Sequence, residues 1–479
     1  MQIKPIHILG VLLFVGTLCV ITMALMPVSG SAEAGGSEFR FPSFTTFFSE
    51  EDYVEPEFET TEELFEVYEM EVDSLAIKDS LLRIETERRL DLLKIQYPRD
   101  DKSSLHEFFE ACQEAKDGKK IRVMHYGDSQ IEGDRISGYL RNELQKKFGG
   151  RGPGYQQAFE VIPTIGITQS SSDNWVRKTV YGRRDTSITH KDYGLLAHFS
   201  TYPPDSTAID SLPDAWLEFE PSKITYSRAK NWKKIVVRYG HNEKPFMLNL
   251  IENDSLRENI IVSPTDGMGR LAWNFEETPE KIRLEFKGDA PDIYGISFEG
   301  HTGINLDNIP LRGSSGTIFK KISKEQLARQ WNPLNVELFL LQFGGNTIPY
   351  IEDTLAAKRY GNWFKSQIKY IKSIEPNASI IVIGPSDMSV KDGGKFVTRP
   401  FLTDVRDALK KAAFDTGCGF WDIYEVMGGR NSMKTWVESE PALAGKDYTH
   451  FTPKGARKMA ELFCKTFWEE YEEWEINRP

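Results

Sequence analysis

Ser129 and His450 are far apart in the chain. A serine hydroxyl and a histidine imidazole together can carry out nucleophilic acyl transfer. Ser129 lies in Gly127-Asp128-Ser129-Gln130, directly after the apolar run IRVMHY. A serine in a tight turn between a strand and a helix is exposed at the carboxyl edge of a sheet. Its N–H lies near a helix N-terminus, where negative charge is favoured. The alternative is an ordinary polar turn, because Gly, Asp and Ser are common in turns.

Asp447 stands three residues before His450, in a segment that precedes the last expected helix. This spacing lets the carboxylate accept a hydrogen bond from one imidazole nitrogen while the other nitrogen faces outward. Such a carboxylate stabilises the imidazolium that forms when histidine takes a proton from serine. The alternative is a capping loop in which Thr452 and Pro453 begin the helix.

Two glycine-containing segments could stabilise negative charge during such a reaction. Gly344-Gly345-Asn346-Thr347 follows the run ELFLLQF, and the side-chain amide of Asn346 could donate to a developing oxyanion. In the segment 307–316 (DNIPLRGSSG), Gly313 would let a backbone N–H approach a ligand closely. A glycine turn and a flexible loop are the respective alternatives.

The elements that must position these residues follow an α/β pattern in two parts of the chain. The first part is IRVMHY, followed by a helical pattern that Gly149-Gly150 end. In the second part, the strand-like runs ELFLLQF, SIIVIG and GFWDIY alternate with helical patterns at 356–374, 401–415 and 453–475. This alternation predicts a three-layer α/β domain with a doubly wound parallel sheet.

The region between the two parts has a different pattern. Residues 155–300 contain alternating runs such as AWLEFE, KKIVVRY, FMLNLI and KIRLEF, separated by turn signals, which predict an inserted antiparallel β-sandwich. Aromatic rings can stack on sugar faces, but we expect the tryptophans of this region in its core. They are Trp175, Trp216, Trp232 and Trp273. The expectation is strongest for Trp216 and Trp273, because both lie within strand-like runs.

The composition limits the class of protein. A chain of 479 residues with 40% hydrophobic and 27% charged residues is typical of a globular protein with more than one domain. The formal net charge of −12 disfavours a nucleic-acid partner. The four cysteines form no CxxC pair, so we expect free thiols and neither a zinc site nor a disulfide framework. We expect no cofactor, and the sequence leaves protein partners unknown.

The N-terminus indicates export from the cytoplasm. Residues 8–26 carry no charge and follow Lys4, so residues 1–32 predict a signal peptide or, preferably, an uncleaved membrane anchor. Residues 33–110 predict an acidic spacer and a helical stalk. The remaining chain would work at the periplasmic or extracellular face.

The ordered set of motifs resembles the SGNH hydrolase superfamily, also called GDSL-like esterases. The resemblance covers roughly residues 119–154 and 301–475 and implies one catalytic α/β domain in two parts. It implies a catalytic triad of Ser129, Asp447 and His450, and an oxyanion hole formed by Ser129, Gly313 and Asn346. Gly316 could align in place of Gly313, and GGNT departs from the common GxND while it keeps the asparagine.

A narrower resemblance points to the substrate. Residues 427–436, the segment KDYTHFT (446–452), the segment 307–313 and the inserted sandwich resemble bacterial peptidoglycan O-acetylesterases. This implies removal of O-acetyl groups from a cell-envelope polysaccharide through an acyl-enzyme on Ser129. Periplasmic polysaccharide O-acetyltransferases share the triad and are an alternative. A non-catalytic glycan-binding protein is a second alternative, against which the intact motif set argues.

Overall fold

The computed structural model describes residues 17, 20–22, 24, 25, 31–34, 37–40, 90–183, 185–203 and 213–478. The chain divides into two units, Met1–Ile84 and Glu85–Pro479. In the first unit, β1 (Ser31–Ala34) pairs with β2 (Ser37–Arg40) as an antiparallel hairpin. The parallel sheet, the sandwich and the helices around them all belong to the second unit.

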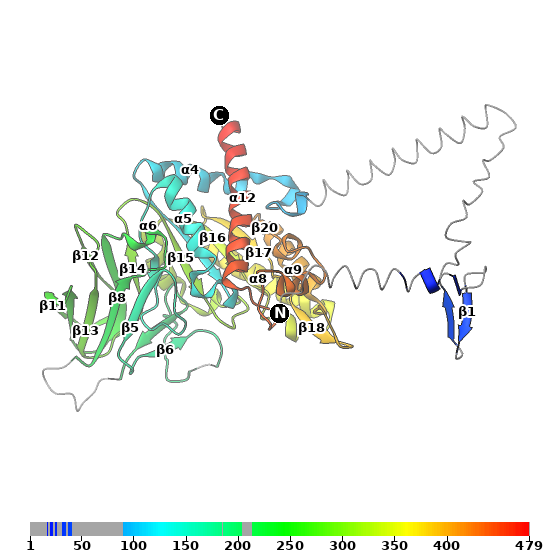
Figure 1. The fold of residues 1–479 in the computed structure, drawn as a ribbon. Helices are drawn as coiled ribbons and strands as arrows, with labels where there is room; N and C mark the ends of the chain where they lie inside the picture. Colours follow the sequence, from blue (N-terminus) through cyan, green and yellow to red (C-terminus); the bar gives the residue numbers. More distant parts are fainter. Residues whose placement is uncertain are drawn as a thin grey trace. The chain divides into compact units, whose positions relative to one another are not determined.

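A five-stranded parallel sheet forms the centre of the α/β part (Figure 1), in the order β15-β3-β16-β17-β20. Its strands are β3 (Lys120–Gly127), β15 (Gly303–Pro310), β16 (Val336–Gln342), β17 (Ser379–Ile383) and β20 (Gly419–Trp421). β15 and β16 lie on opposite sides of β3. The winding therefore reverses at β3, and open α/β sheets bind ligands at the carboxyl ends of the strands where this happens.

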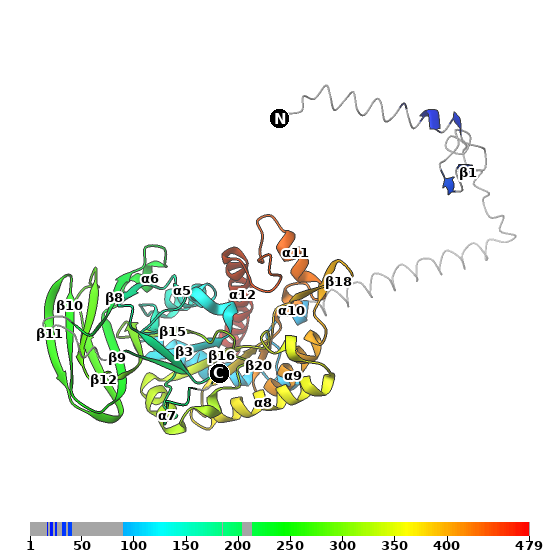
Figure 2. The same cartoon turned by 90° about the horizontal axis from the view of Figure 1, so that it is seen from below.

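Helices cover both faces of this sheet (Figure 2). Because side chains alternate along a strand, Ile121 and Val123 of β3 enter one core while Met124 and Tyr126 enter the other. The first core contains residues of α4 (His106–Lys116), α5 (Ser137–Phe148), α11 (Ser432–Glu438) and α12 (Pro453–Asn477). The second contains residues of α7 (Lys324–Trp331), α8 (Thr354–Lys372) and α9 (Leu402–Phe414).

Between α5 and β15 the chain forms two antiparallel sheets that share one apolar core. One has the order β11-β10-β13-β8-β5, and the other has the order β12-β9-β14-β7-β6 with β4 beside β14. The bounds are β4 (Gly154–Gln156), β5 (Ile167–Ser171), β6 (Val176–Thr179), β7 (His198–Thr201), β8 (Ala215–Pro221), β9 (Lys234–Asn242), β10 (Phe246–Glu252), β11 (Ser255–Val262), β12 (Thr265–Asn274), β13 (Ile282–Gly288) and β14 (Asp292–Glu299). A short helix, α6 (Ser227–Lys230), lies between β8 and β9.

Two further pieces complete the second half of the chain. β18 (Ser389–Asp392) and β19 (Lys395–Thr398) form a small hairpin, and α10 (Ile423–Val426) follows β20. The predicted combination of a parallel sheet with inserted antiparallel sheets is confirmed. The domain boundaries stay a prediction, because the sandwich and the α/β part lie within one compact unit.

The expected burial of tryptophan holds for three of the four residues in the sandwich. Trp175, Trp232 and Trp273 are buried. For Trp216 the expectation was wrong, because this side chain is only half-buried. Ala215 and Leu217 point into the core, so the alternation of the strand places Trp216 on the outer face. There the guanidinium carbon of Arg283 lies 4.0 Å from the centre of its ring.

The predicted export segment, residues 1–32, lies largely outside the described residues, as do the spacer and stalk up to residue 89. None of the helices formed by the described residues has the length and apolar character needed to cross a membrane. Membrane anchoring therefore stays a prediction. Cys112, Cys418 and Cys464 are free and buried, as expected, whereas Cys19 lies outside the described residues.

Candidate active site at the carboxyl edge of the parallel sheet

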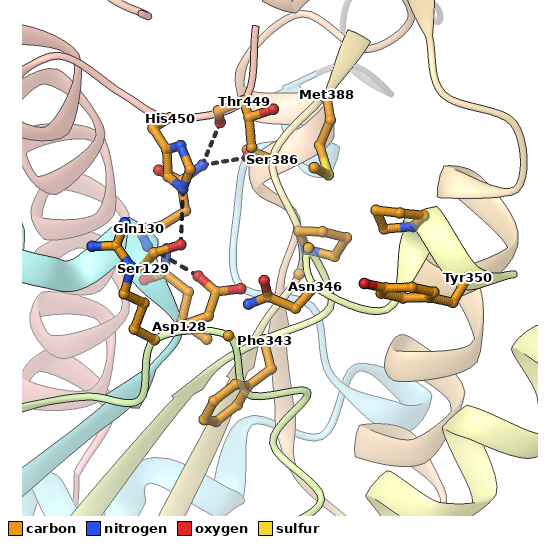
Figure 3. A pocket seen from close by; sticks show the side chains of 17 residues that line it. Asp128, Ser129, Gln130, Phe343, Asn346, Tyr350, Ser386, Met388, Thr449 and His450 are labelled. Carbon is orange, nitrogen blue, oxygen red and sulfur yellow. Dashed lines mark hydrogen bonds between the residues drawn. The ribbon is translucent and has the colours of Figure 1, made fainter. Parts of the chain in front are cut away.

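The structure brings Ser129, His450 and Asp447 into one chain of hydrogen bonds. Figure 3 shows Ser129 and His450 within it. Ser129 Oγ lies 2.8 Å from His450 Nε2, and His450 Nδ1 lies 2.7 Å from Asp447 Oδ2. The carboxylate can only accept while it is ionised, so Nδ1 carries the proton and Nε2 is left to accept from the serine. This is the arrangement in which an imidazole acts as the base for a serine nucleophile.

The position of Ser129 follows from the tight turn at the end of β3. The strand ends at Gly127, where a Cβ would lie 3.0 Å from the side chain of Ile131 and 3.1 Å from the carbonyl oxygen of Gln342. A larger residue at this position would therefore press against both the turn and β16. Asp128 caps the following 3₁₀ helix, because its Oδ1 accepts from the N–H of Gln130 at 3.0 Å. Ser129 is thereby held at the carboxyl edge of the sheet.

The loop before α12 preorganises Asp447 and His450. Asp447 Oδ1 accepts from the backbone N–H groups of Thr449 and His450, both at 3.1 Å. Partial burial raises the pKa of Asp447, but hydrogen bonds from the His450 ring and these N–H groups outweigh it and hold the pKa below its ordinary value. Asp447 is therefore ionised at neutral pH. Thr452 and Pro453 begin α12, so the expected capping role and the histidine's place beside Ser129 coexist.

Gly313 and Asn346 follow the two neighbours of β3 in the sheet and line the same cavity as Ser129 and His450. Gly313 has φ +78°, and a Cβ there would meet open space. Gly316 does not line the cavity, since a Cβ at that position would lie 2.6 Å from the ring of Phe343. Of the two glycines that could align in this motif, only Gly313 thus lines the cavity together with Ser129. Asn346 Nδ2 donates one hydrogen bond to the carbonyl oxygen of Ser314 at 3.2 Å.

The cavity has a volume of about 320 Å³ and lies directly against Ser129 Oγ and the His450 ring. Pro385 and Met388 come from the segment after β17, and Phe343 comes from the end of β16. Tyr350 forms part of the rim, and 82% of its surface is exposed. The space accommodates a small acyl group, and its mouth carries an exposed aromatic ring.

Sequence reasoning missed the residue that joins the two halves of this site. Gln130 Nε2 donates to the carbonyl oxygen of Thr449 at 2.7 Å and to Ser386 Oγ at 3.0 Å. Its Oε1 accepts from the N–H of Phe451 at 3.2 Å. A single amide side chain therefore fastens the histidine loop to the serine turn. The only sequence signal was its place directly after Ser129, because its partners are distant in the chain.

Arg135 and Asp128 also support the turn. The Arg135 guanidinium donates to the carbonyl oxygens of Glu132 and Phe451 at 2.8 and 2.9 Å. Burial raises the pKa of Asp128 to about 6, even though the hydrogen bond from the Gln130 N–H and the nearby His450 lower it. Asp128 therefore ionises at a higher pH than an ordinary aspartate does.

Among the described residues, side chains that could ligate a metal ion gather only in the sandwich, at His190, Asp192 and His241. The two imidazole rings stack in parallel, with centroids 4.0 Å apart and planes at 2°. A ligated metal lies near the plane of each imidazole, and parallel rings do not share such a point. His241 Nε2 instead lies 3.0 Å from Asp192 Oδ2, and His190 Nε2 lies 3.1 Å from Asp292 Oδ2.

Neither a family model nor a curated protein matches this chain. A solved structure of a peptidoglycan O-acetylesterase superposes with a TM-score of 0.59 and 19% identity, covering 77% of this chain and 96% of that chain. At this identity the likeness shows the fold alone. Together with the sheet order and the site described above, it defines the class: the chain has an SGNH/GDSL hydrolase-like fold.

Two other solved structures overlap less. They are the salicylyl-acyltransferase SsfX3 from a tetracycline biosynthetic pathway (TM-score 0.25, 13% identity, 55% of this chain and 83% of that chain) and the acetyl xylan esterase AlAXEase (TM-score 0.26, 14% identity, 35% and 80%). Overlap at this level supports no argument about this chain.

Proposed function

We propose that this chain is a serine esterase that removes O-acetyl groups from a cell-envelope polysaccharide such as peptidoglycan. The observation that carries the proposal is the unbroken hydrogen-bond chain from Ser129 through His450 to Asp447, at the wall of an open cavity. The likeness in fold to a peptidoglycan O-acetylesterase and the exposed ring of Tyr350 at the mouth support a carbohydrate substrate. Aromatic side chains offer an apolar face against which a sugar can pack.

In the proposed reaction, His450 Nε2 takes the proton from Ser129 Oγ as this oxygen attacks the acetyl carbonyl carbon. The carbonyl oxygen becomes an oxyanion, which the N–H groups of Ser129 and Gly313 and the second Nδ2 hydrogen of Asn346 stabilise. Losing one such donor usually costs about 3–4 kcal/mol of transition-state stabilisation. The ester C–O bond then breaks, and His450 returns the proton to the departing sugar oxygen. Water attacks the acetyl-serine by the same route, and acetate leaves.

The test is acetate release from O-acetylated peptidoglycan and from a chromogenic acetyl ester. Ser129→Ala should lower kcat/KM by about 10⁴-fold or more while circular dichroism stays unchanged. The matched control is Ser366→Ala on α8, a serine whose Oγ donates to the Trp363 carbonyl and which does not line the cavity. Retained hydrolysis in Ser129→Ala would rule out the proposed nucleophile.

The same assay with an added acceptor sugar separates hydrolysis from acetyl transfer. A polysaccharide O-acetyltransferase would pass the acetyl group to the sugar hydroxyl, and free acetate would fall in proportion. We expect acetate release to be independent of the acceptor. Binding of peptidoglycan without any ester cleavage would favour a glycan-binding protein. The proposed function also places the enzyme outside the cytoplasm, in agreement with the apolar N-terminal segment of the sequence.

A further inference from the structure

A second cavity, of about 310 Å³, lies where the sandwich meets the amino end of β3. Its wall includes Lys120 of β3, Tyr155 of β4, and Lys234 and Arg238 of β9. Ser129 follows the opposite end of β3, and eight residues of strand span more than about 20 Å. This cavity is therefore separate from the candidate active site.

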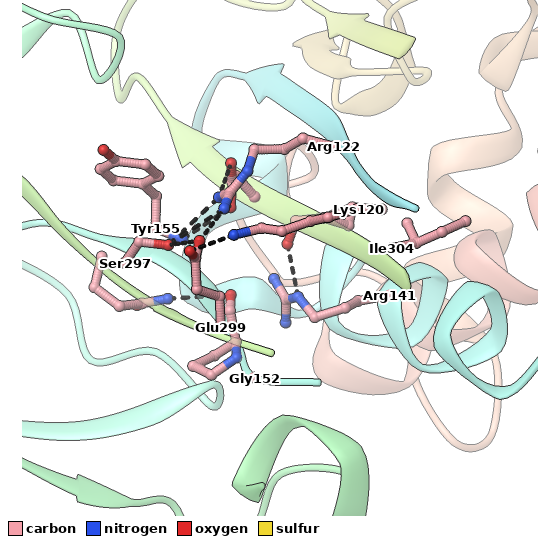
Figure 4. Close-up of polar contacts among 12 residues, drawn as sticks. Lys120, Arg122, Arg141, Gly152, Tyr155, Ser297, Glu299 and Ile304 are labelled. Atoms are coloured by element: carbon pink, nitrogen blue, oxygen red, sulfur yellow. Dashed lines mark hydrogen bonds and ion pairs between the residues drawn. The ribbon is translucent and has the colours of Figure 1, made fainter. Parts of the chain in front are cut away.

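The acidic groups around this cavity are already engaged (Figure 4). Arg122, which is fully buried, donates to both oxygens of Asp307 at 2.8 and 2.9 Å and pairs with Glu299. Glu299 also pairs with Lys120 and accepts from Ser297 Oγ at 2.8 Å. Two cations and two carboxylates thus balance each other in one network that joins β3, β14 and β15.

Three further cations line the same cavity: Lys234, Arg238 and Arg270. Arg270 of β12 lies directly opposite Arg238 in the antiparallel ladder, a placement in which like charges destabilise a sheet. Lys234 lies opposite Glu299, whose carboxylate is taken by Arg122 and Lys120. In the described part of the chain, no carboxylate forms an ion pair with any of these three. The wall therefore carries an excess of positive charge in a protein of net charge −12.

Two buried donors at this cavity have no hydrogen-bond acceptor among the described residues. Arg238 is only 3% exposed, its Nε is unpartnered, and its Nη1 reaches only the sulfur of Met268 at 3.9 Å. The Tyr155 hydroxyl is unpartnered too. The Arg122 guanidinium carbon lies 5.5 Å from the centre of the Tyr155 ring, and in Figure 4 the hydroxyl is at the end of the ring away from the ion-pair network. Buried polar groups almost always have a partner, so these donors indicate one that is supplied from outside the chain.

We propose that this cavity binds a small oxyanion group, a carboxylate or a phosphate. The planar guanidinium of Arg238 matches the oxygens of either group, Tyr155 supplies a neutral donor, and Lys234 and Arg270 supply charge at the more open side. Such a site would hold an acidic substituent of a glycan or a free phosphate ion at a distance from Ser129. The inference does not depend on the proposed esterase activity.

The experiment is isothermal titration of the full chain at constant ionic strength with inorganic phosphate, glucuronate and glucose. We expect saturable binding of phosphate or glucuronate, with their relative affinities identifying the preferred source, and no binding of glucose. Arg238→Met and Lys234→Met should each weaken the affinity about tenfold or more, because each removes a charge-assisted contact. Lys411→Met is the matched control. Lys411 is an exposed cation on α9 that does not line this cavity, so the variant should leave the affinity for the anion unchanged.

Two results would overturn the proposal. One is the absence of saturable binding of both anions to the unaltered chain. The other is an unchanged affinity in Lys234→Met and Arg270→Gln. These two side chains are more exposed than Arg238, so both variants decide the question even where Arg238→Met does not fold. Hydrolysis of a chromogenic ester by Lys234→Met should equal that of the unaltered chain, which separates a failure of this site from a failure of the proposed nucleophile.

Discussion

The two ends of β3 use polar side chains in opposite ways. At the amino end, the side chains of Arg122 and Asp307 are 0% exposed and form an ion pair with each other. Beyond the carboxyl end, the side chains of His450 and Asp447 are 38% and 52% exposed. The buried ion pairs of Arg122 with Asp307 and Glu299 hold the parallel sheet to the sandwich. The partly exposed pair of His450 and Asp447, beside a cavity, remains able to move a proton. The comparison shows that exposure, rather than the number of polar contacts, separates the architectural network from the candidate active site.

The largest expected effect comes from the carboxyl end. Asp447→Asn should lower kcat by about 10⁴-fold, because an amide no longer fixes the histidine tautomer or stabilises the imidazolium. The free energy of unfolding should change little, since the loop is exposed. Ester hydrolysis and urea denaturation of the same preparation measure the two quantities. A large loss of stability with activity retained per folded molecule would reverse the roles of the two ends.

The next effect is at the amino end. Arg122→Met should lower the free energy of unfolding by about 3–5 kcal/mol, because it leaves buried carboxylates of Asp307 and Glu299 without their main partner. The kcat of the folded fraction should stay the same. Lys411→Met, which removes an exposed ion pair with Asp415, is the control and should cost less than about 1 kcal/mol. Equal losses in the two variants would contradict the architectural role of the network.

A smaller effect on stability is expected for Asp128. This carboxyl group lies next to Ser129 in the chain and is buried, as the carboxyl groups of the Arg122 network are. Because burial raises the pKa of Asp128 to about 6, the Asp128 carboxyl group binds its proton more tightly in the folded chain than in the unfolded chain. The resulting stability is fully present below about pH 4 and is lost as the pH rises through 6. Asp128→Asn should therefore be more stable than the unaltered chain by about 2–3 kcal/mol at pH 7.5, with little difference at pH 4. Urea denaturation at both pH values measures this, and a difference independent of pH would refute it.

The smallest effect concerns the rim of the cavity. Tyr350→Ala should raise KM for an O-acetylated glycan about fivefold, because the sugar loses an aromatic face worth about 1 kcal/mol. It should leave kcat/KM for a small chromogenic ester unchanged, since that substrate does not reach the rim. Steady-state kinetics on both substrates measures the difference. An equal change for both would assign Tyr350 to the fold and not to sugar recognition.

Much of the fold could be predicted because its strands are apolar runs. IRVMHY and SIIVIG are buried on both faces, and the alternation in AWLEFE shows which residues enter the sandwich core. β15 was missed because GINLDNIP contains polar residues that are buried only through distant partners. Asp307, for example, is satisfied by Arg122 and by the N–H of Tyr155. No local pattern encodes such a pairing.

The same distinction applies to the site. The proximity of Ser129, Asp447 and His450 could be expected because each lies in a short motif with a recognisable type and spacing. Their role as a set was implied by resemblance. In the structure Ser129, His450, Gly313 and Asn346 line one cavity, and Asp447 contacts it only through His450. Gln130 could not be assigned a role, since its partners Ser386 and Thr449 are 256 and 319 positions away. The three unpaired cations of the second cavity were equally invisible, because cross-strand register brings them together.

The insertion of the sandwich between α5 and β15 has a consequence for how the chain assembles. Ser129 and His450 are 321 positions apart, and β3 cannot gain its neighbours until much later segments have been synthesised. In the finished fold the ends of the insertion meet, because the N–H of Ile304 donates to the carbonyl oxygen of Gly149 at 3.1 Å. Once the sandwich has folded, the flexible connection between α5 and β15 is short, and the entropic cost of pairing β15 with β3 is lower. In this view the inserted region favours closure of the parallel sheet at whose edge the candidate active site lies.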